Sequence, residues 1–135
     1  MARGSVRREV RIKRPADEVW AIVGDPARVQ EWFTGIDSST VDGTTCVVTT
    51  GSGLPMPEEI VTNDPIQRRF QYRITAGMFN EHLSTIDVVD LGDGTSLVTY
   101  AADADPGTMA LIIAGAAGSA LLELRDRLEV QEEPR

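Results

Sequence analysis

Two side chains on predicted strands have the clearest chemical potential. His82 is the single histidine of the chain, and it alternates with Ser84 in a run of β-favouring residues. In an apolar pocket a histidine can orient a ligand's carbonyl group or act as an acid/base, because its ordinary pKa lies near working pH. The alternatives are a hydrogen-bonded or half-exposed histidine at the strand's start, or a register slip that turns Glu81 inward instead.

The second side chain is Glu58, which is followed directly by Glu59. Neighbouring residues of a strand point to opposite faces, so only one of the two can enter a pocket. That disfavours a pair of carboxyl groups converging on one reacting centre. A buried Glu58 would need a partner such as Tyr72, His82 or a water molecule. The other reading is a solvated glutamate at the start of a strand.

Other site chemistries find little support. One cysteine, Cys46, and one histidine cannot supply the three or four ligands of a zinc site. The aspartates between 87 and 93 recur every third residue on a strand that leads into a turn, so their oxygens diverge. The glycine-rich segment 51–53 has no following Gly-Lys-Ser/Thr and is no phosphate loop. We expect no metal and no cofactor.

Composition limits the function classes further. The chain has 135 residues and a formal net charge of −8, which fits one domain and argues against nucleic acid and anionic membrane surfaces. The single cysteine excludes an internal disulfide, and no apolar segment follows the basic residues 1–8, so we expect a cytoplasmic protein. The apolar stretch Met109–Leu122 is too short to span a bilayer, so we expect no stable membrane insertion.

These side chains must be positioned by a chain that reads as α+β. A strand at about 6–12 is followed by two short helices, which start at Pro15 and Pro26. Strands and turns then fill 36–105, with Asp42-Gly43 and Asp93-Gly94 as hairpin signals. A long helix is predicted from 107 to about 129, before a frayed tail (130–135). Strands followed by a terminal helix favour an antiparallel sheet with helices on one face.

The order of short motifs resembles a known superfamily. Pro15-Ala16-Asp17-Glu18-Val19-Trp20, then Glu31-Trp32-Phe33, the strand Gly94–Tyr100 and the terminal helix are similar to the SRPBCC proteins (START, Bet v 1-like and polyketide cyclase/dehydratase). The resemblance spans roughly Ser5–Leu128 and implies one domain, 1–135, with a core at about 5–129. It implies a helix-grip fold, in which a seven-stranded curved antiparallel sheet surrounds the C-terminal helix and leaves an apolar cavity.

A narrower similarity lies at Ser52-Gly53-Leu54-Pro55, which looks like the gate loop of the plant abscisic acid receptors. Those receptors also carry a cavity glutamate where this chain has Glu58. Their latch motif falls at Gly77-Met78-Phe79 here, and the lysine that anchors the hormone carboxylate aligns near Phe33. A gated apolar pocket is therefore implied more strongly than a carboxylate ligand.

The implied cavity takes one face of each strand as its wall, the terminal helix as its floor and Phe33 with Leu54 at its mouth. A solid core made of the same residues is the alternative. The expected ligand-binding residues are Phe33, Leu54, Glu58, Phe70, Tyr72, Phe79, His82, Ser84, Ile86, Met109, Ile112 and Ile113.

Three functions follow from these patterns. The first is binding or carriage of a small hydrophobic molecule such as a lipid, polyketide or isoprenoid. The second is a cyclase/dehydratase-type enzyme with His82 as its acid/base, and the third is a protein-interaction module. We expect a monomer or homodimer, because the small residues Ala110, Ala114 and Gly118 could admit either the sheet or a second helix.

Overall fold

Seven strands, two α-helices and one 3-10 helix make up residues 3–130, the part of the chain that this computed structural model describes. In chain order the elements are β1 (Gly4–Ile12), α1 (Ala16–Val23), η1 (Pro26–Glu31), β2 (Ile36–Asp42), β3 (Thr45–Thr50), β4 (Pro55–Asp64), β5 (Arg69–Ile74), β6 (Glu81–Asp90), β7 (Ser96–Asp105) and α2 (Gly107–Val130). The tail expected at 130–135 lies outside the described residues except for Val130, which ends α2.

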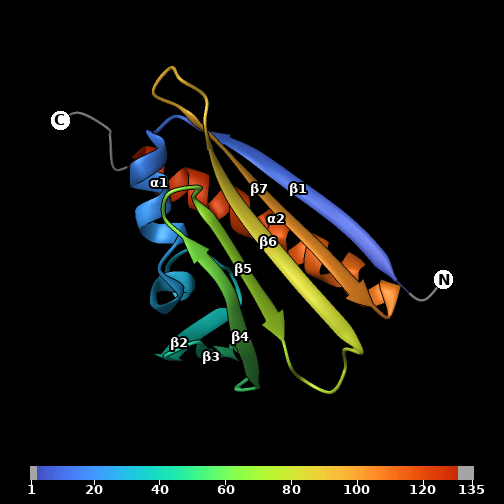
Figure 1. Ribbon diagram of the computed structural model, residues 1–135. Coiled ribbons are helices and arrows are strands. Elements are labelled where there is room, and N and C mark those ends of the chain that lie inside the picture. Colours follow the sequence, from blue (N-terminus) through green and yellow to red (C-terminus); the bar gives the residue numbers. More distant parts are fainter. Residues whose placement is uncertain (1–2, 131–135) are drawn as a thin grey trace.

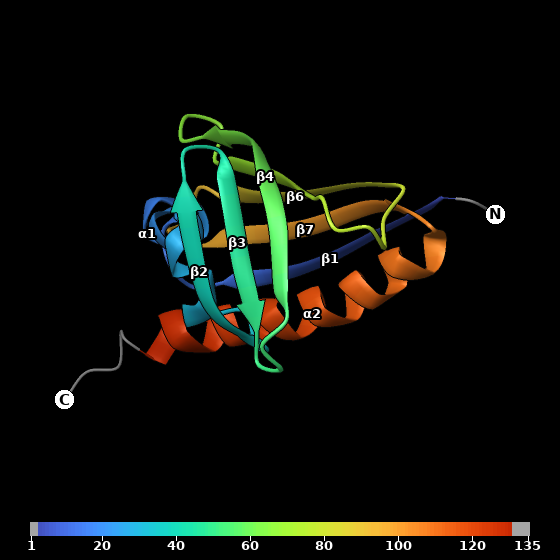
Figure 2. The same cartoon turned by 90° about the horizontal axis from the view of Figure 1, so that it is seen from below.

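The strands form one antiparallel sheet in the order β1-β7-β6-β5-β4-β3-β2. The first two strands of the chain therefore lie at opposite edges, and α1 and η1 carry the chain between them. The sheet curves so that β2, β3 and β4 bend over α2 (Figures 1 and 2). The helix-grip fold, with short helices after the first strand, is confirmed.

Strict alternation along the central strands sets which side chains face α2. His82, Ser84 and Ile86 on β6 are buried, whereas Glu81 is exposed. The register agrees, because His82 pairs with Ala104 and Ile86 with Tyr100, both buried residues of β7. The prediction that His82, Ser84 and Ile86 face inward from β6 is thus confirmed. The one-residue register slip that would turn Glu81 inward does not occur.

The face of α2 that meets the sheet is built from alanine. Ala110, Ala114, Ala117 and Ala120 are almost fully buried against β1 and β7. Small side chains let the helix approach closely, and at its start a Cβ on Gly4 would lie 2.8 Å from the carbonyl oxygen of Gly107. The stripe that contains Ala110 and Ala114 therefore serves contact with the sheet, and a homodimer stays a prediction.

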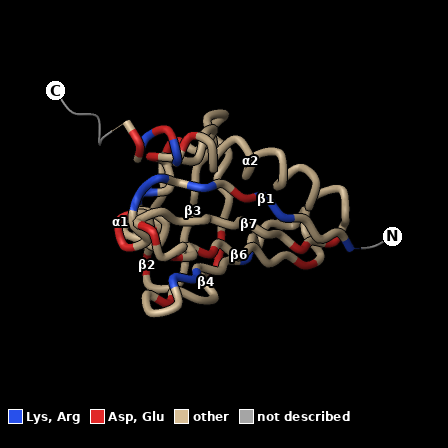
Figure 3. The backbone as a smooth tube through the Cα atoms, turned by 90° about the horizontal axis from the view of Figure 1, so that it is seen from above, with Lys and Arg blue, Asp and Glu red and all other residues tan. Residues whose placement is uncertain are grey.

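The other face of α2 is unusually apolar. Leu111 and Leu122 are 65% and 49% exposed, and the helix carries no charge before Glu123 (Figure 3). By length and composition α2 is the one helix within residues 3–130 that could cross a membrane. This differs from the expectation based on the shorter run Met109–Leu122, because the helix has 24 residues. Here it packs along the sheet, and the lack of stable membrane insertion stays a prediction.

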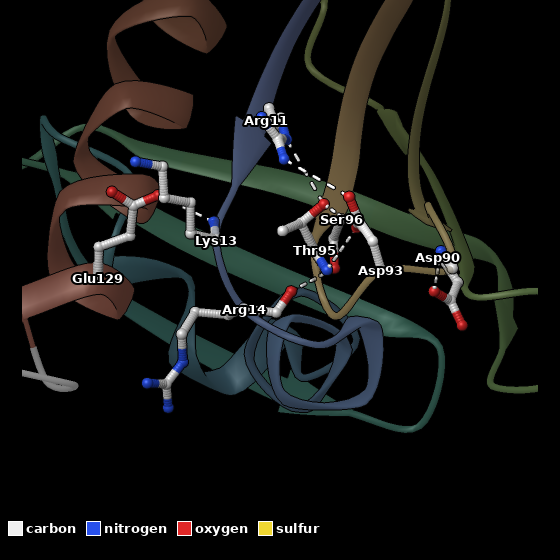
Figure 4. A network of polar contacts seen from close by, with 9 residues as sticks. Arg11, Lys13, Arg14, Asp90, Asp93, Thr95, Ser96 and Glu129 are labelled. Carbon is white, nitrogen blue, oxygen red and sulfur yellow. Dashed lines mark hydrogen bonds and ion pairs between the residues drawn. The ribbon is translucent and has the colours of Figure 1, made fainter.

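A polar network fastens the far end of β1 (Figure 4). The backbone N–H of Lys13 donates to Glu129 near the end of α2 at 2.9 Å. The hydroxyl of Ser96 donates to the carbonyl of Arg14 at 2.7 Å. Arg11 also lies 3.6 Å from Asp93 in the turn between β6 and β7. The end of β1 is therefore bound both to the β6–β7 hairpin and to the last turns of α2.

Candidate functional site

A cavity of about 340 Å³ lies between the inner face of the sheet, the η1 segment and α2. Its wall includes side chains from β3, β4, β5, β6 and β7, and α2 closes one side with Ile112, Ile113 and Ala116. Most of the lining is aliphatic or aromatic. A concave, mainly apolar pocket with a few polar groups is the usual form of a small-molecule site.

Seven of the twelve predicted ligand-binding residues line this cavity. They are Phe33, Glu58, Phe70, Tyr72, Ile86, Ile112 and Ile113. The alternation on β5 and β6 explains Phe70, Tyr72 and Ile86, since each lies on the concave face.

The other five predicted residues lie elsewhere. Leu54 is 49% exposed on the turn between β3 and β4, which Thr50 closes by hydrogen bonds to its backbone. Met109 lies one turn before the part of α2 that reaches the cavity. Phe79 packs against His82, with ring centroids 5.1 Å apart. His82 and Ser84 are buried on the same face of β6 as Ile86 but are not part of the cavity lining.

Both ring nitrogens of His82 have partners. Nδ1 accepts the backbone N–H of Ile74 at 2.8 Å, and Nε2 lies 2.8 Å from the hydroxyl of Ser84. Because Nδ1 accepts, the proton of the neutral ring belongs on Nε2, which donates to Ser84. Burial, helped by the charge of Arg73, lowers the pKa of His82 to about 4. A neutral ring with both nitrogens bound fastens β6 to β5 and is poorly placed to move protons in the cavity.

Replacing His82 is therefore expected to affect stability more than binding. His82→Phe leaves the Ile74 N–H without a partner and removes one of the partners of the Ser84 hydroxyl, which also bonds to Tyr72. We expect the free energy of unfolding to fall by about 2–4 kcal/mol. His82→Asn should recover part of this loss, because its amide oxygen can accept the Ile74 N–H. Denaturant titration gives the stability of both variants. A variant as stable as the wild type would contradict this structural role.

Two tyrosine hydroxyls form the polar centre of the wall. Tyr72 on β5 and Tyr100 on β7 are both buried, and their hydroxyl groups share a hydrogen bond. Burial raises the pKa of each phenol. The ring of Tyr72 also packs on His82, with centroids 5.5 Å apart. Both tyrosines are therefore fixed and neutral, with their rings exposed to the ligand space.

Glu58 is the most perturbed acid of the site. It lies on β4, directly across from Cys46 on β3, and both residues line the cavity. Burial raises the pKa of the Glu58 carboxyl to about 8. The carboxyl has no hydrogen bond or ion pair to any residue within 3–130, including the expected partners Tyr72 and His82. A carboxyl group perturbed by burial in a cavity marks a site where a ligand can be bound or a proton moved.

Several cavity residues were not among the sequence predictions. They include Val29, Trp32, Cys46, Val48, Met56 and Tyr100. Period-2 alternation could have found three of them. Tyr100 shares a face with the buried Val98 and Ala102, while Cys46 and Val48 share a face of β3. Trp32 had no such signal, because it reaches the wall through the irregular chain after η1.

A curved antiparallel sheet closed around a long helix over an apolar cavity defines the helix-grip class of ligand-cavity proteins. A family model described as polyketide cyclase / dehydrase and lipid transport matches residues 3–129, so the chain belongs to this family. The resemblance to the SRPBCC superfamily is thereby confirmed. A comparison with curated proteins finds no match.

Solved structures with the same fold come from distant relatives. XoxI from Bacillus cereus matches with a TM-score of 0.89 and 20% identity, over 97% of this chain and 99% of that one. A START superfamily protein from Mycobacterium smegmatis matches at 0.70 and 17%, over 94% and 95%. Norcoclaurine synthase from Thalictrum flavum, in complex with dopamine and hydroxybenzaldehyde, matches at 0.73 and 15%, over 98% and 90%. At these identities the likeness concerns the fold alone.

Proposed function

We propose that the protein binds or carries a small, mainly hydrophobic molecule in the cavity between the sheet and α2. The observation that carries this proposal is the volume of about 340 Å³ together with its almost wholly apolar wall. A solid core would have left no such space. The family description, which includes lipid transport, agrees with this use of the fold. A cytoplasmic location belongs to the same proposal and rests on the single buried thiol, Cys46.

The two other functions have less support. A cyclase or dehydratase that uses His82 as acid/base would need a free ring nitrogen in the cavity, and both nitrogens are engaged outside the cavity lining. An interaction module would use the exposed Leu54 and the apolar face of α2, yet it gives the cavity no role. Ligand binding is the function that accounts for the apolar cavity of about 340 Å³.

The test is native mass spectrometry of freshly purified protein, paired with the denatured protein. A discrete extra mass that disappears on denaturation would support the proposal, and extraction would identify the ligand class. A bare mass would be followed by a thermal-shift screen of apolar compounds. Ligand at ~100 times its dissociation constant adds about 2.7 kcal/mol to the free energy of unfolding. No bound mass and no shift with any compound would contradict ligand binding.

A further inference from the structure

The carboxyl group of Glu58 is an unpaired acid in an apolar wall. It projects from β4 into the cavity, whereas the next residue, Glu59, is exposed on the opposite face. No hydrogen bond or ion pair within residues 3–130 reaches the Glu58 side chain. The Glu58 side chain is half-buried, so its carboxyl group is reached from the cavity. An acid that is partly withdrawn from water and has no partner in the protein leaves a bonding site for a ligand.

The groups around Glu58 do not supply a counter-charge. Three titratable groups have a pKa that is shifted by the charge of Glu58: Cys46 on β3, Tyr72 on β5 and Tyr100 on β7. A thiol or a phenol is either neutral or negatively charged, so none of the three can act as a cation. The second carboxylate of the lining, Asp25, accepts the backbone N–H of Ala27.

No cation faces the acid either. α2 contributes only Ile112, Ile113 and Ala116, and the described lining contains no lysine, arginine or histidine. An anionic ligand would lie beside the Glu58 carboxyl group and would find no cation in the lining to bind it. A cationic ligand would supply the missing partner.

We propose that the preferred ligand is a mostly apolar molecule with one basic nitrogen, which binds as an ammonium group against the carboxylate of Glu58. This inference rests on the proposed function and names the ligand class of the same site. Charge-assisted hydrogen bonds of this kind are about twice as strong as neutral ones. The aliphatic and aromatic wall takes the rest of the molecule.

Binding of such a ligand changes the proton count. At pH 7 the Glu58 carboxyl of the free protein mostly holds its proton, because burial raises its pKa to about 8. The amine arrives from water as an ammonium ion. Formation of the carboxylate–ammonium pair therefore releases the Glu58 proton to solvent, close to one per ligand at pH 7. At pH 9.5 the carboxyl is already ionised, and the release falls toward zero.

Three probes with one naphthalene skeleton test the proposal: 2-(2-naphthyl)ethylamine, 2-(2-naphthyl)ethanol and 3-(2-naphthyl)propionate. Isothermal titration calorimetry at pH 7 in two buffers of different ionisation enthalpy gives the affinity and the proton release together. We expect the amine to bind at least about tenfold more tightly than the alcohol, a difference of about 1.4 kcal/mol, and the carboxylate to bind weakest. Proton release in the wild type needs no variant, so this measurement stands even if a substitution impairs folding.

Glu58→Gln keeps the size of the side chain and removes its charge. The amine should lose its proton release and its advantage over the alcohol, so that the ratio of the two affinities falls toward one. Glu59→Gln, which changes the adjacent exposed glutamate, is the matched control and should behave as the wild type.

The outcomes separate the two proposals. If the alcohol binds and the amine binds no more tightly, or binds without releasing a proton, the basic-nitrogen inference is overturned and the proposed function stands. If all three probes fail to bind, the inference falls. Native mass spectrometry then decides separately whether the cavity holds any other molecule.

Discussion

Glu58→Gln is expected to remove most of the alkaline loss of stability. The carboxyl has a pKa of about 8 in the folded protein and its ordinary value of 4.5 when unfolded. The folded state therefore binds the proton more tightly, and stability is lost as pH rises from 4.5 through 8. Relative to the Gln variant, the wild type should lose up to about 4 kcal/mol between pH 5 and pH 9.

The measurement is urea unfolding of both proteins at several pH values, with the difference in free energy plotted against pH. His82 works in the opposite direction, because its pKa is lowered to about 4 and its contribution is lost as pH falls below 6.5. That contribution is common to both proteins and cancels in the difference. The titration of Cys46 does not cancel fully, because the charge of Glu58 raises the pKa of its thiol. Glu59→Gln should follow the wild type. Parallel wild-type and Glu58→Gln curves from pH 5 to pH 9 would show that the Glu58 carboxyl is hydrated rather than buried.

Ala116→Trp is expected to abolish binding while leaving the fold intact. Ala116 on α2 lines the cavity. It is also exposed, so a larger side chain at this position does not clash with the packed core. An indole directed inward between Ile112 and the sheet would occupy much of the 340 Å³. We expect the affinity for 2-(2-naphthyl)ethanol to fall at least about a hundredfold, which corresponds to about 2.7 kcal/mol.

Ser119→Trp provides the control for this substitution. Ser119 is exposed on the same helix, one turn further on, and does not line the cavity. It should bind the probe as the wild type does. Circular dichroism and thermal unfolding of both variants would verify that the helix still packs on the sheet. Unchanged affinity in Ala116→Trp would place the bound probe outside the cavity between the sheet and α2.

The fold could be predicted from local signals because those signals agree with one another. Phe70 and Tyr72 alternate with polar residues, and the Asp42-Gly43 turn has the positive φ of 63° that glycine adopts easily. Together with a single long terminal helix, such patterns leave few architectures. The inward face of β6 followed from the same alternation.

The cavity wall was harder to predict, because it depends on distances across the molecule. Alternation places His82 on the concave face, but only the hydrogen bonds to Ile74 and Ser84 show that its ring is engaged outside the cavity lining. Leu54 looked like a mouth residue on the strength of four matching residues, yet its side chain is 49% exposed and is not part of the lining. Trp32 enters through irregular chain, to which no periodic pattern applies.

The position of β1 in the sheet has a consequence for the making of the protein. β1 leaves the ribosome first, but its neighbour in the sheet is β7, so that Gly4 pairs with Ala104. Its other main support is α2, which follows all the strands in the chain. Contacts between residues so far apart in sequence form late. β1 thus stays without its partner strand until β7 has been synthesised, and the cavity can enclose a ligand only after α2 has been synthesised as well.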